Sequence, residues 1–274
     1  MDLKTLMDQV IPVVKHVGEL ILLDRESFTW ADVEFKGQND LVSYVDRNAE
    51  DRLVGKLSRL LAGCGFINEE GGHYHADAEA VWIIDPLDGT TNFVHGVPFF
   101  CTSVALQWQG QICMGIIYEP NRDELYTAIR GQGAYLNGAR IQVSSNRNTE
   151  DAFLSTGFPY RKGQNIDGYL NLLRAYMGHI RGIRRMGSAA MDLAFTAAGR
   201  FDGFFEASLN PWDVAAGALL VQEAGGTVTD YWGQQDWLFG QSILAANTAL
   251  HPGLLRLMTD YLHAHGLKPG DSLG

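Results

Sequence analysis

The stretch VWIIDPLDGTTN (residues 81–92) joins a fully apolar run to two acidic residues. The apolar run is typical of a strand that is buried on both faces. Pro86 and Gly89 exclude a helix here, so we expect Asp85 and Asp88 to lie in a tight loop at the carboxyl end of the strand. Ligand sites of α/β sheets usually lie at that end. The stretch therefore predicts a site built around two carboxylates.

Such a loop can direct the carboxylates of Asp85 and Asp88 and the carbonyl oxygen of Leu87 into one small volume. Two carboxylates within about 4 Å cannot both stay ionised in a partly dry site unless a positive charge neutralises them. Oxygen ligands favour Mg²⁺, which keeps several waters and shares its coordination with substrate phosphate. The spacing alone is equally consistent with a structural role, because Asp often caps a turn or a helix.

Length and charge restrict the classes of protein to consider. The 274 residues suit one large α/β domain or two intimately packed halves, and the net charge of −11 argues against nucleic acid or an anionic membrane as the main partner. Cys64, Cys101 and Cys113 form no metal-binding pattern, which favours a reduced, cytoplasmic protein. The charged N-terminus does not resemble a signal peptide, and no apolar run reaches the ~20 residues that span a bilayer.

Sequence periodicity predicts helices and strands in both halves of the chain. Apolar residues at helical spacing predict a first helix from about residue 3, which we expect Pro12 to kink or interrupt, and a second helix between Ser43 and Gly63. Alternation with turn residues predicts an antiparallel meander over residues 102–138. The polar stretch 144–151 is the expected boundary between an N-terminal half (1–145) with most of the site and a C-terminal half (146–274). The fold class is α+β, with layers of helix and sheet.

Four stretches resemble the motifs of one known family, and they follow one another in the same order as in that family. They are KGQNDLVSYVDRNAE (36–50), VWIIDPLDGTTNFVHGVPFF (81–100), RRMGSAAMDLAFTAAGRFDGFFE (184–206) and NPWDVAAGALLVQEAGG (210–226). The chain resembles the inositol monophosphatase family of lithium-sensitive, magnesium-dependent phosphatases. The resemblance implies an αβαβα layered sandwich of the sugar-phosphatase type.

The resemblance also implies a set of metal ligands for two to three Mg²⁺ ions. They are Glu69, Asp85, the Leu87 carbonyl, Asp88 and Asp213. Glu69 follows Asn68, where the family usually has glycine, so Glu70 is a competing choice. Asp213 also suits a simple N-cap of the following helix.

Two further residues take catalytic roles by the same resemblance. Thr90 and Glu69 would orient a metal-activated water and accept its proton. The backbone amides of Gly89 and Thr90 would bind the phosphate. The alternative for Thr90 is that its hydroxyl caps a helix.

Substrate contacts and a third metal follow from other matched positions. The turn Gly187, Ser188 and Ala189 would contact the polyol through its backbone, and Glu206 would accept hydrogen bonds from its hydroxyl groups. Lys36 and Asp46 match a water-rich third metal region. Taken alone, Lys36 is a surface lysine, Asp46 belongs to a capping box and Glu206 is an acid at a strand end.

The resemblance implies a phosphomonoesterase that attacks a sugar-alcohol phosphate with metal-activated water, and myo-inositol 1-phosphate is the best single substrate. Fructose 1,6-bisphosphate, adenosine 3′,5′-bisphosphate and histidinol phosphate remain open. So does a protein-binding regulatory role on the same fold. Relatives are commonly homodimers, and apolar strands such as residues 112–118 are one candidate interface.

Overall fold

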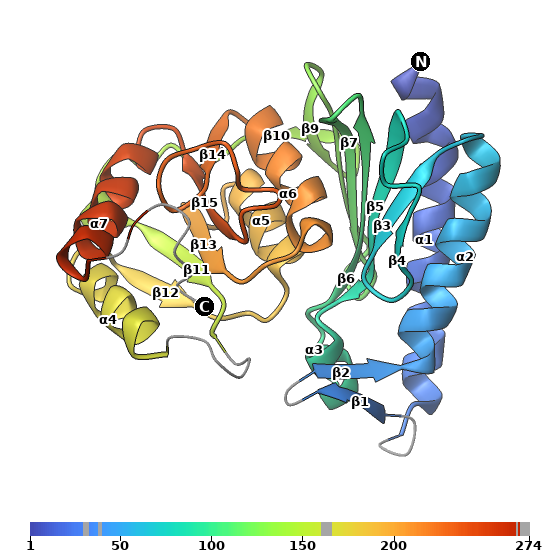
Figure 1. The fold of residues 1–274 in the computed structure, drawn as a ribbon, viewed down its shortest axis with the longest axis horizontal. Helices are drawn as coiled ribbons and strands as arrows, with labels where there is room; N and C mark the ends of the chain where they lie inside the picture. Colours follow the sequence, from blue (N-terminus) through green and yellow to red (C-terminus); the bar gives the residue numbers. More distant parts are fainter. Residues whose placement is uncertain (30–32, 38–39, 160–165, 267, 269–274) are drawn as a thin grey trace.

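Helices and sheets alternate in five layers (Figure 1). The computed structural model describes all residues except 30–32, 38–39, 160–165, 267 and 269–274, and it describes only the backbone of residues 34–37, 40–43 and 73. The helices are α1 (Leu3–Ser27), α2 (Tyr44–Leu60), α3 (Thr90–His95), α4 (Ile166–Met177), α5 (Ala189–Ala197), α6 (Pro211–Glu223) and α7 (His251–Ala264). Helices α1 and α2 cover the outer face of the larger sheet, α5 and α6 lie between the sheets, and α4 and α7 cover the outer face of the smaller sheet. The predicted layered α+β fold is confirmed.

The larger sheet has the strand order β10-β9-β8-β7-β6-β5-β3-β4. Its strands are β3 (Gly65–Asn68), β4 (Gly72–Tyr74), β5 (Ala80–Asp88), β6 (Cys101–Trp108), β7 (Gln111–Glu119), β8 (Glu124–Ile129), β9 (Gly133–Leu136) and β10 (Ala139–Ile141). Strands β5 to β10 pair antiparallel in succession, which confirms the predicted meander, whereas β3 runs parallel to β5. Because they are parallel, the carboxyl ends of β3 and β5 meet at one edge of the sheet. A separate hairpin joins β1 (Val33–Gly37) to β2 (Asp40–Ser43).

The smaller sheet has the strand order β12-β11-β13-β15-β14. Its strands are β11 (Phe153–Thr156), β12 (Gly182–Arg184), β13 (Gly203–Ala207), β14 (Gly226–Thr229) and β15 (Ser242–Asn247). Strand β11 runs parallel to both neighbours, and β15 runs antiparallel to β13 and β14. The polar stretch 144–151 lies between the last strand of the larger sheet and the first strand of the smaller one, and the division into halves at 145/146 stays a prediction.

Small residues let the middle helix layer fit between the two sheets. A Cβ atom on Gly115 of β7 would lie 2.9 Å from the carbonyl oxygen of Ala216 on α6, and one on Gly217 would lie 2.5 Å from Cβ of Leu193 on α5. Larger residues would push these elements apart, because protein interiors are close-packed. The close packing fixes the amino end of α6 relative to the larger sheet.

Helix α1 runs continuously through Pro12, so the expected interruption is wrong. Proline removes one backbone hydrogen bond within a helix. The side chains of Val10, Val14 and Val17 lie in the core on both sides of Pro12, with exposed fractions of 0%, 0% and 1%. Burial of this apolar face holds the helix together across the proline. No helix in the described part of the chain has both the length and the apolar character needed to cross a membrane.

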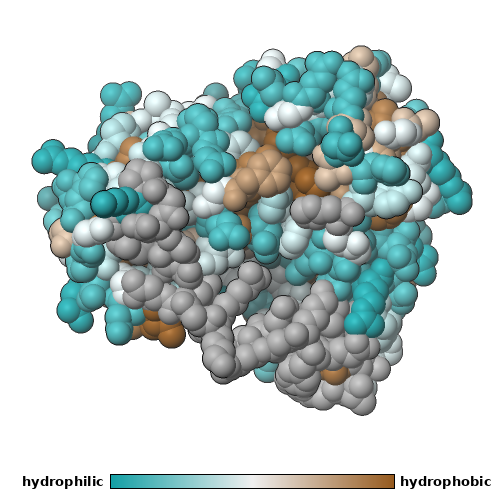
Figure 2. Space-filling model, viewed as in Figure 1, coloured by the Kyte–Doolittle hydropathy of each residue, from teal (hydrophilic) through white to brown (hydrophobic). Residues whose placement is uncertain are grey.

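Hydrophilic side chains dominate the coloured surface in Figure 2, with apolar side chains in separate patches.

Residues 112–118, one candidate for a dimer interface, lie in β7 in the middle of the larger sheet. Their side chains belong to the buried core, so this stretch cannot form an interface. The sequence pattern identified an apolar strand but not the layers that cover both its faces.

Candidate active site

The two acids of the opening stretch lie at a bulge near the end of β5. The pairing of β5 with β6 shifts in register between Asp85 and Asp88, and the ladder resumes at Asp88. The expected free loop is therefore wrong: the strand continues through a β-bulge. Pro86 has no N–H for the ladder, and its carbonyl accepts a hydrogen bond of 2.9 Å from the Thr102 hydroxyl. The bulge re-aims the side chains on either side of the proline.

A short network of hydrogen bonds fixes the residues that follow the bulge. The Leu87 amide donates to Oδ1 of Asp85 (3.0 Å). Oγ1 of Thr90 lies 3.1 Å from the Leu87 carbonyl oxygen and 3.1 Å from Oδ1 of Asp46. Gly89, at φ 100°, is the N-cap of α3, so the alternative that Thr90 caps this helix is wrong. The Thr90 hydroxyl instead lies between an acid of α2 and a carbonyl of the bulge.

Glu69 follows β3 and Asp85 lies near the end of β5, and Asp213 of α6 is close enough to interact electrostatically with both. Burial raises the pKa of Glu69 well above its usual range, and the negative charge of Asp213 raises it further. Burial and the charges of Glu69, Asp88 and Asp213 likewise raise the pKa of Asp85. Glu69 and Asp85 thus lie close enough for each to affect the pKa of the other. The structure thus directs Glu69 into the carboxylate cluster.

Asp88 faces the amino end of α5. Its Oδ2 accepts hydrogen bonds of 2.7 Å from the Ser188 hydroxyl and 2.7 Å from the Ala190 amide. Burial raises the pKa of Asp88 to about 6, although these hydrogen bonds and the nearby Arg185 oppose the shift. The predicted substrate-binding turn Gly187, Ser188 and Ala189 therefore lies directly beside Asp88.

Glu206 lies near the end of β13, close enough to Asp192 of α5 to affect its pKa. A Cβ atom on Gly157, just after β11, would lie 1.8 Å from Oε1 of Glu206, so this glycine makes room for the carboxylate. Asp192 on α5 is fully buried, and burial together with the charges of Glu206 and Asp88 raises its pKa well above the usual range. Asp192 therefore lies close to both Asp88 and Glu206.

Asp213, the third residue of α6, accepts a hydrogen bond of 2.6 Å from the Asn210 amide. It is not the N-cap, which is Asn210. Asp46 is buried on α2, where it reaches Thr90, whereas the side chain of Lys36 on β1 is outside the described atoms. The structure thus connects Asp46 to the bulge.

Glu50, one turn after Asp46 on α2, supports the site and was missed by sequence reasoning. It is buried, and it accepts a hydrogen bond of 2.8 Å from the Glu70 amide and another from the Gly71 amide. A Cβ atom on Gly71 would lie 2.5 Å from Oε1 of Glu50. Glu50 therefore anchors the turn that follows Glu69. An acid at a core-facing helical position was the available signal.

We expect Glu50→Gln to lower phosphate release about 10- to 100-fold at limiting Mg²⁺, the range seen for residues that orient metal ligands. A glutamine presents one acceptor oxygen, so it cannot satisfy both loop amides equally well. Excess Mg²⁺ should restore part of the loss. The matched control is Glu26→Gln on the exposed side of α1. A variant with an unchanged Mg²⁺ requirement would show that Glu50 does not position Glu69.

Asn92 is a second residue whose role was not predicted. Its Nδ2 donates to the carbonyl oxygens of Phe99 (2.7 Å) and Met186 (2.9 Å). These bonds tie α3 to the segment that enters the turn at Gly187. Asn92 thereby links the two stretches that face Asp88.

The oxygen atoms of these acids and of the Leu87 carbonyl suit a hard divalent cation, although the side chains are not arranged around a single ion position. Among the described residues, no three His, Cys, Asp or Glu side chains are placed to hold an ion as they stand. Glu69 and Asp85 lie close to each other, and neither forms an ion pair with a described Lys or Arg. Carboxylate and carbonyl oxygens are the ligands that Mg²⁺ prefers, and a cation would relieve the mutual repulsion of these acids. The residues therefore fit Mg²⁺ chemically.

We expect the metal-free protein to lose stability as the pH rises from about 4 to about 6.5. The pKa of Asp88 is about 6 in the folded chain against an ordinary 3.8, so the unfolded chain releases the proton more readily. The folded state is then disfavoured by up to about 3 kcal/mol above pH 6. Thermal melting in EDTA should show the fall, and Mg²⁺ should suppress it. An equally steep fall in Asp88→Asn would assign the effect to other groups.

The layered fold and the carboxylate cluster define the class of the protein. The model of the inositol monophosphatase family matches residues 2–263. The chain belongs to this family, and it is a phosphatase.

Individual relatives agree with this assignment over nearly the whole chain. It is 43% identical to the Nus factor SuhB of Pseudomonas aeruginosa (95% of this chain, 98% of that one) and 43% identical to an inositol-1-monophosphatase of Mesorhizobium japonicum (94% and 98%). Among solved structures, the extragenic suppressor protein suhB from Bartonella henselae superposes with a TM-score of 0.87 at 43% identity (93% and 98%). The inositol monophosphatase from Anabaena gives a TM-score of 0.85 at 33% identity (98% and 98%).

Proposed function

We propose that the protein is a Mg²⁺-dependent phosphomonoesterase that hydrolyses a sugar-alcohol phosphate, with myo-inositol 1-phosphate as its substrate. The observation that carries this proposal is the group of acids Glu69, Asp85, Asp88 and Asp213, in which burial raises the pKa of Glu69 and Asp85. Acids that face each other without a described cation suit a site completed by metal ions. Inositol-1-monophosphatases among the relatives support the substrate.

Each residue of the site has a definite task in this proposal. Glu69, Asp85, the Leu87 carbonyl, Asp88 and Asp213 would hold two Mg²⁺ ions, and Lys36 and Asp46 would border a third. When bound, Mg²⁺ supplies charge neutralisation and lowers the pKa of water toward neutrality.

The remaining groups act on water and substrate. The Thr90 hydroxyl would orient the attacking water, and Glu69 would accept its proton. The amides of Gly89 and Thr90 would bind phosphate oxygens. Glu206 would accept a hydrogen bond from a substrate hydroxyl, and its position against Gly157 restricts where that hydroxyl lies.

A phosphate-release panel tests the proposal directly. It compares inositol 1-phosphate, fructose 1,6-bisphosphate, histidinol phosphate and adenosine 3′,5′-bisphosphate, each in Mg²⁺, in EDTA and in Mg²⁺ with millimolar Li⁺. We expect the highest kcat/KM for inositol 1-phosphate, no release in EDTA and inhibition by Li⁺. Turnover in EDTA equal to that in Mg²⁺ would refute the metal-dependent mechanism. A higher kcat/KM for another ester would identify that ester, and not inositol 1-phosphate, as the preferred substrate.

A protein-binding role is a second candidate function, because several relatives carry the name Nus factor. The two roles separate in an inactive variant: Asp85→Asn should lose hydrolysis but retain a protein partner that binds elsewhere.

A homodimer is also proposed, since α4 exposes Ile166, Leu170 and Met177. Sedimentation at several protein concentrations tests it.

A further inference from the structure

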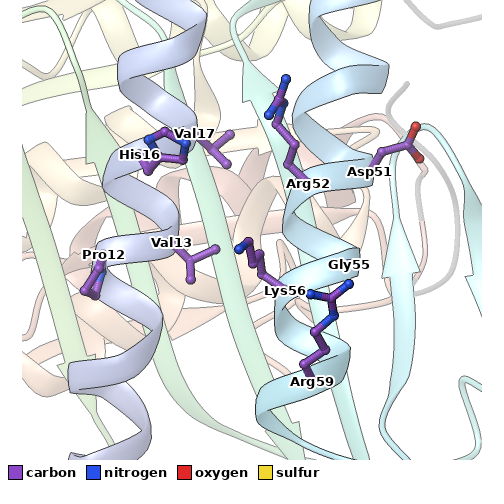
Figure 3. Close-up of a pocket in the computed structure, with 9 residues that line it drawn as sticks. All are labelled: Pro12, Val13, His16, Val17, Asp51, Arg52, Gly55, Lys56 and Arg59. Carbon is purple, nitrogen blue, oxygen red and sulfur yellow. The ribbon is translucent and has the colours of Figure 1, made fainter.

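A groove with basic edges runs between α1 and α2 on the outside of the helix layer. Its volume is about 480 Å³, within the range of sites that bind small molecules. Figure 3 shows Arg52, Lys56 and Arg59 along α2, with Val13 and His16 on α1. The groove is separate from the carboxylate cluster, which lies at the strand ends on the other side of α2.

The three cations form a concentrated positive charge on an acidic protein. Arg52, Lys56 and Arg59 are exposed, and none forms an ion pair or a hydrogen bond within the part of the chain that the structure describes. One carboxylate, Asp51, also lines the groove, so these four side chains carry a net charge of 3 − 1 = +2 in a chain of net charge −11. From Arg52 to Arg59 the helix rises about 10 Å. An anion with several charges can contact all three cations at once.

The floor of the groove is apolar, and a glycine keeps it open. Pro12, Val13 and Val17 of α1 lie along it. Gly55 of α2 also lines the groove, and a Cβ atom there would have no other atom within 4 Å. Packing therefore does not require glycine at this position, although glycine weakens a helix interior. Its effect on the structure is to leave space beside the three cations.

We propose that this groove binds a small organic polyphosphate, whose phosphate groups pair with Arg52, Lys56 and Arg59 while its apolar part lies on Pro12 and Val13. Guanidinium groups bind phosphate through two parallel hydrogen bonds, which favours Arg at such a site. The length of about 10 Å suits a small ligand better than a protein partner, whose standard interface buries about 800 Å² on each side. The groove is a second anion site, independent of the hydrolytic one.

Calorimetric titration with ATP in EDTA at low salt tests the proposal. Without metal ions the carboxylate cluster repels anions, so the groove is the expected site. We expect one ATP per chain, binding that weakens with salt, and weaker binding of inorganic triphosphate, which lacks the apolar part. The double variant R52A/R59A should bind at least about tenfold more weakly, since it loses two charged contacts. Gly55→Leu, which keeps the charge and fills the groove, should do the same.

The matched control is R147A/R256A, which removes two exposed cations elsewhere and should bind within about twofold of the native chain. Thermal melting of each variant shows that it is folded. Absence of ATP binding to the native chain, or an equal loss in the control, would overturn the proposal. A glutamate-rich peptide that binds with the same sensitivity to R52A/R59A, where ATP does not, would replace the small ligand by an acidic protein segment.

Discussion

Asp85→Asn is expected to lower kcat/KM for phosphate release at least about 10³-fold, equivalent to about 4 kcal/mol of transition-state stabilisation. Asp85 is buried at the centre of the cluster, where its pKa is raised by burial and by the charges of Glu69, Asp88 and Asp213. An amide has nearly the same shape as the carboxyl group but no charge with which to hold a cation. The loss should appear in Mg²⁺-dependent hydrolysis of any ester that the enzyme accepts.

The same variant should not unfold the protein. Removal of one of several facing acids relieves like-charge repulsion, so the melting temperature in EDTA at pH 7.5 should equal or exceed that of the native chain. We expect Mg²⁺ to stabilise the native chain and not this variant. Asp77→Asn, an exposed acid in the loop before β5, is the matched control and should behave as the native chain. Activity within tenfold of native would show that Asp85 does not hold the metal.

Local sequence signals were sufficient for the strands and for the acids that end them. A fully apolar run followed by Asp85 correctly predicted a buried strand, and alternation predicted the meander up to β9. The bulge was not predicted, because the proline and glycine that indicate a loop also suit a strand that loses one ladder bond. The interruption predicted at Pro12 was wrong for a related reason. Local propensity disfavours a helix through proline, but burial of Val14 and Val17 stabilises the helix there.

The supporting residues depend on contacts between distant segments, which no local pattern contains. Glu50 reaches the turn after β3, and Gly157 receives the carboxylate of Glu206 from another strand. Asp192 was missed because an acid in an alanine-rich helix resembles a surface position until two sheets enclose it. Its burial on α5, close to Asp88 and Glu206, follows from the tertiary structure alone.

Thr90→Val is expected to lower kcat about 100-fold or more, with a much smaller change in KM. General acid–base groups contribute 10²- to 10⁴-fold in rate, and the Thr90 hydroxyl lies between Asp46 and the Leu87 carbonyl at 3.1 Å from each. Valine keeps the shape but removes the hydroxyl, which also leaves buried Asp46 without that donor. Thr90→Ser should stay within about tenfold of native, because it retains the hydroxyl.

The neighbouring Thr91→Val supplies the control for this prediction, since Thr91 is exposed on α3 and should tolerate the change. Steady-state kinetics at saturating Mg²⁺, together with thermal melting, distinguishes a structural role of the Thr90 hydroxyl from a role in the reaction. A hydroxyl that only holds the fold would lower the melting temperature without a selective fall in kcat. A fall in kcat at unchanged melting temperature, rescued by serine, places the hydroxyl in the reaction. Asp46 and Glu50 are one turn apart on α2, so the same helix face contacts both Thr90 and the turn after Glu69. The loss of activity in the double variant Glu50→Gln/Thr90→Val should therefore differ from the sum of the two single losses, expressed as free energies.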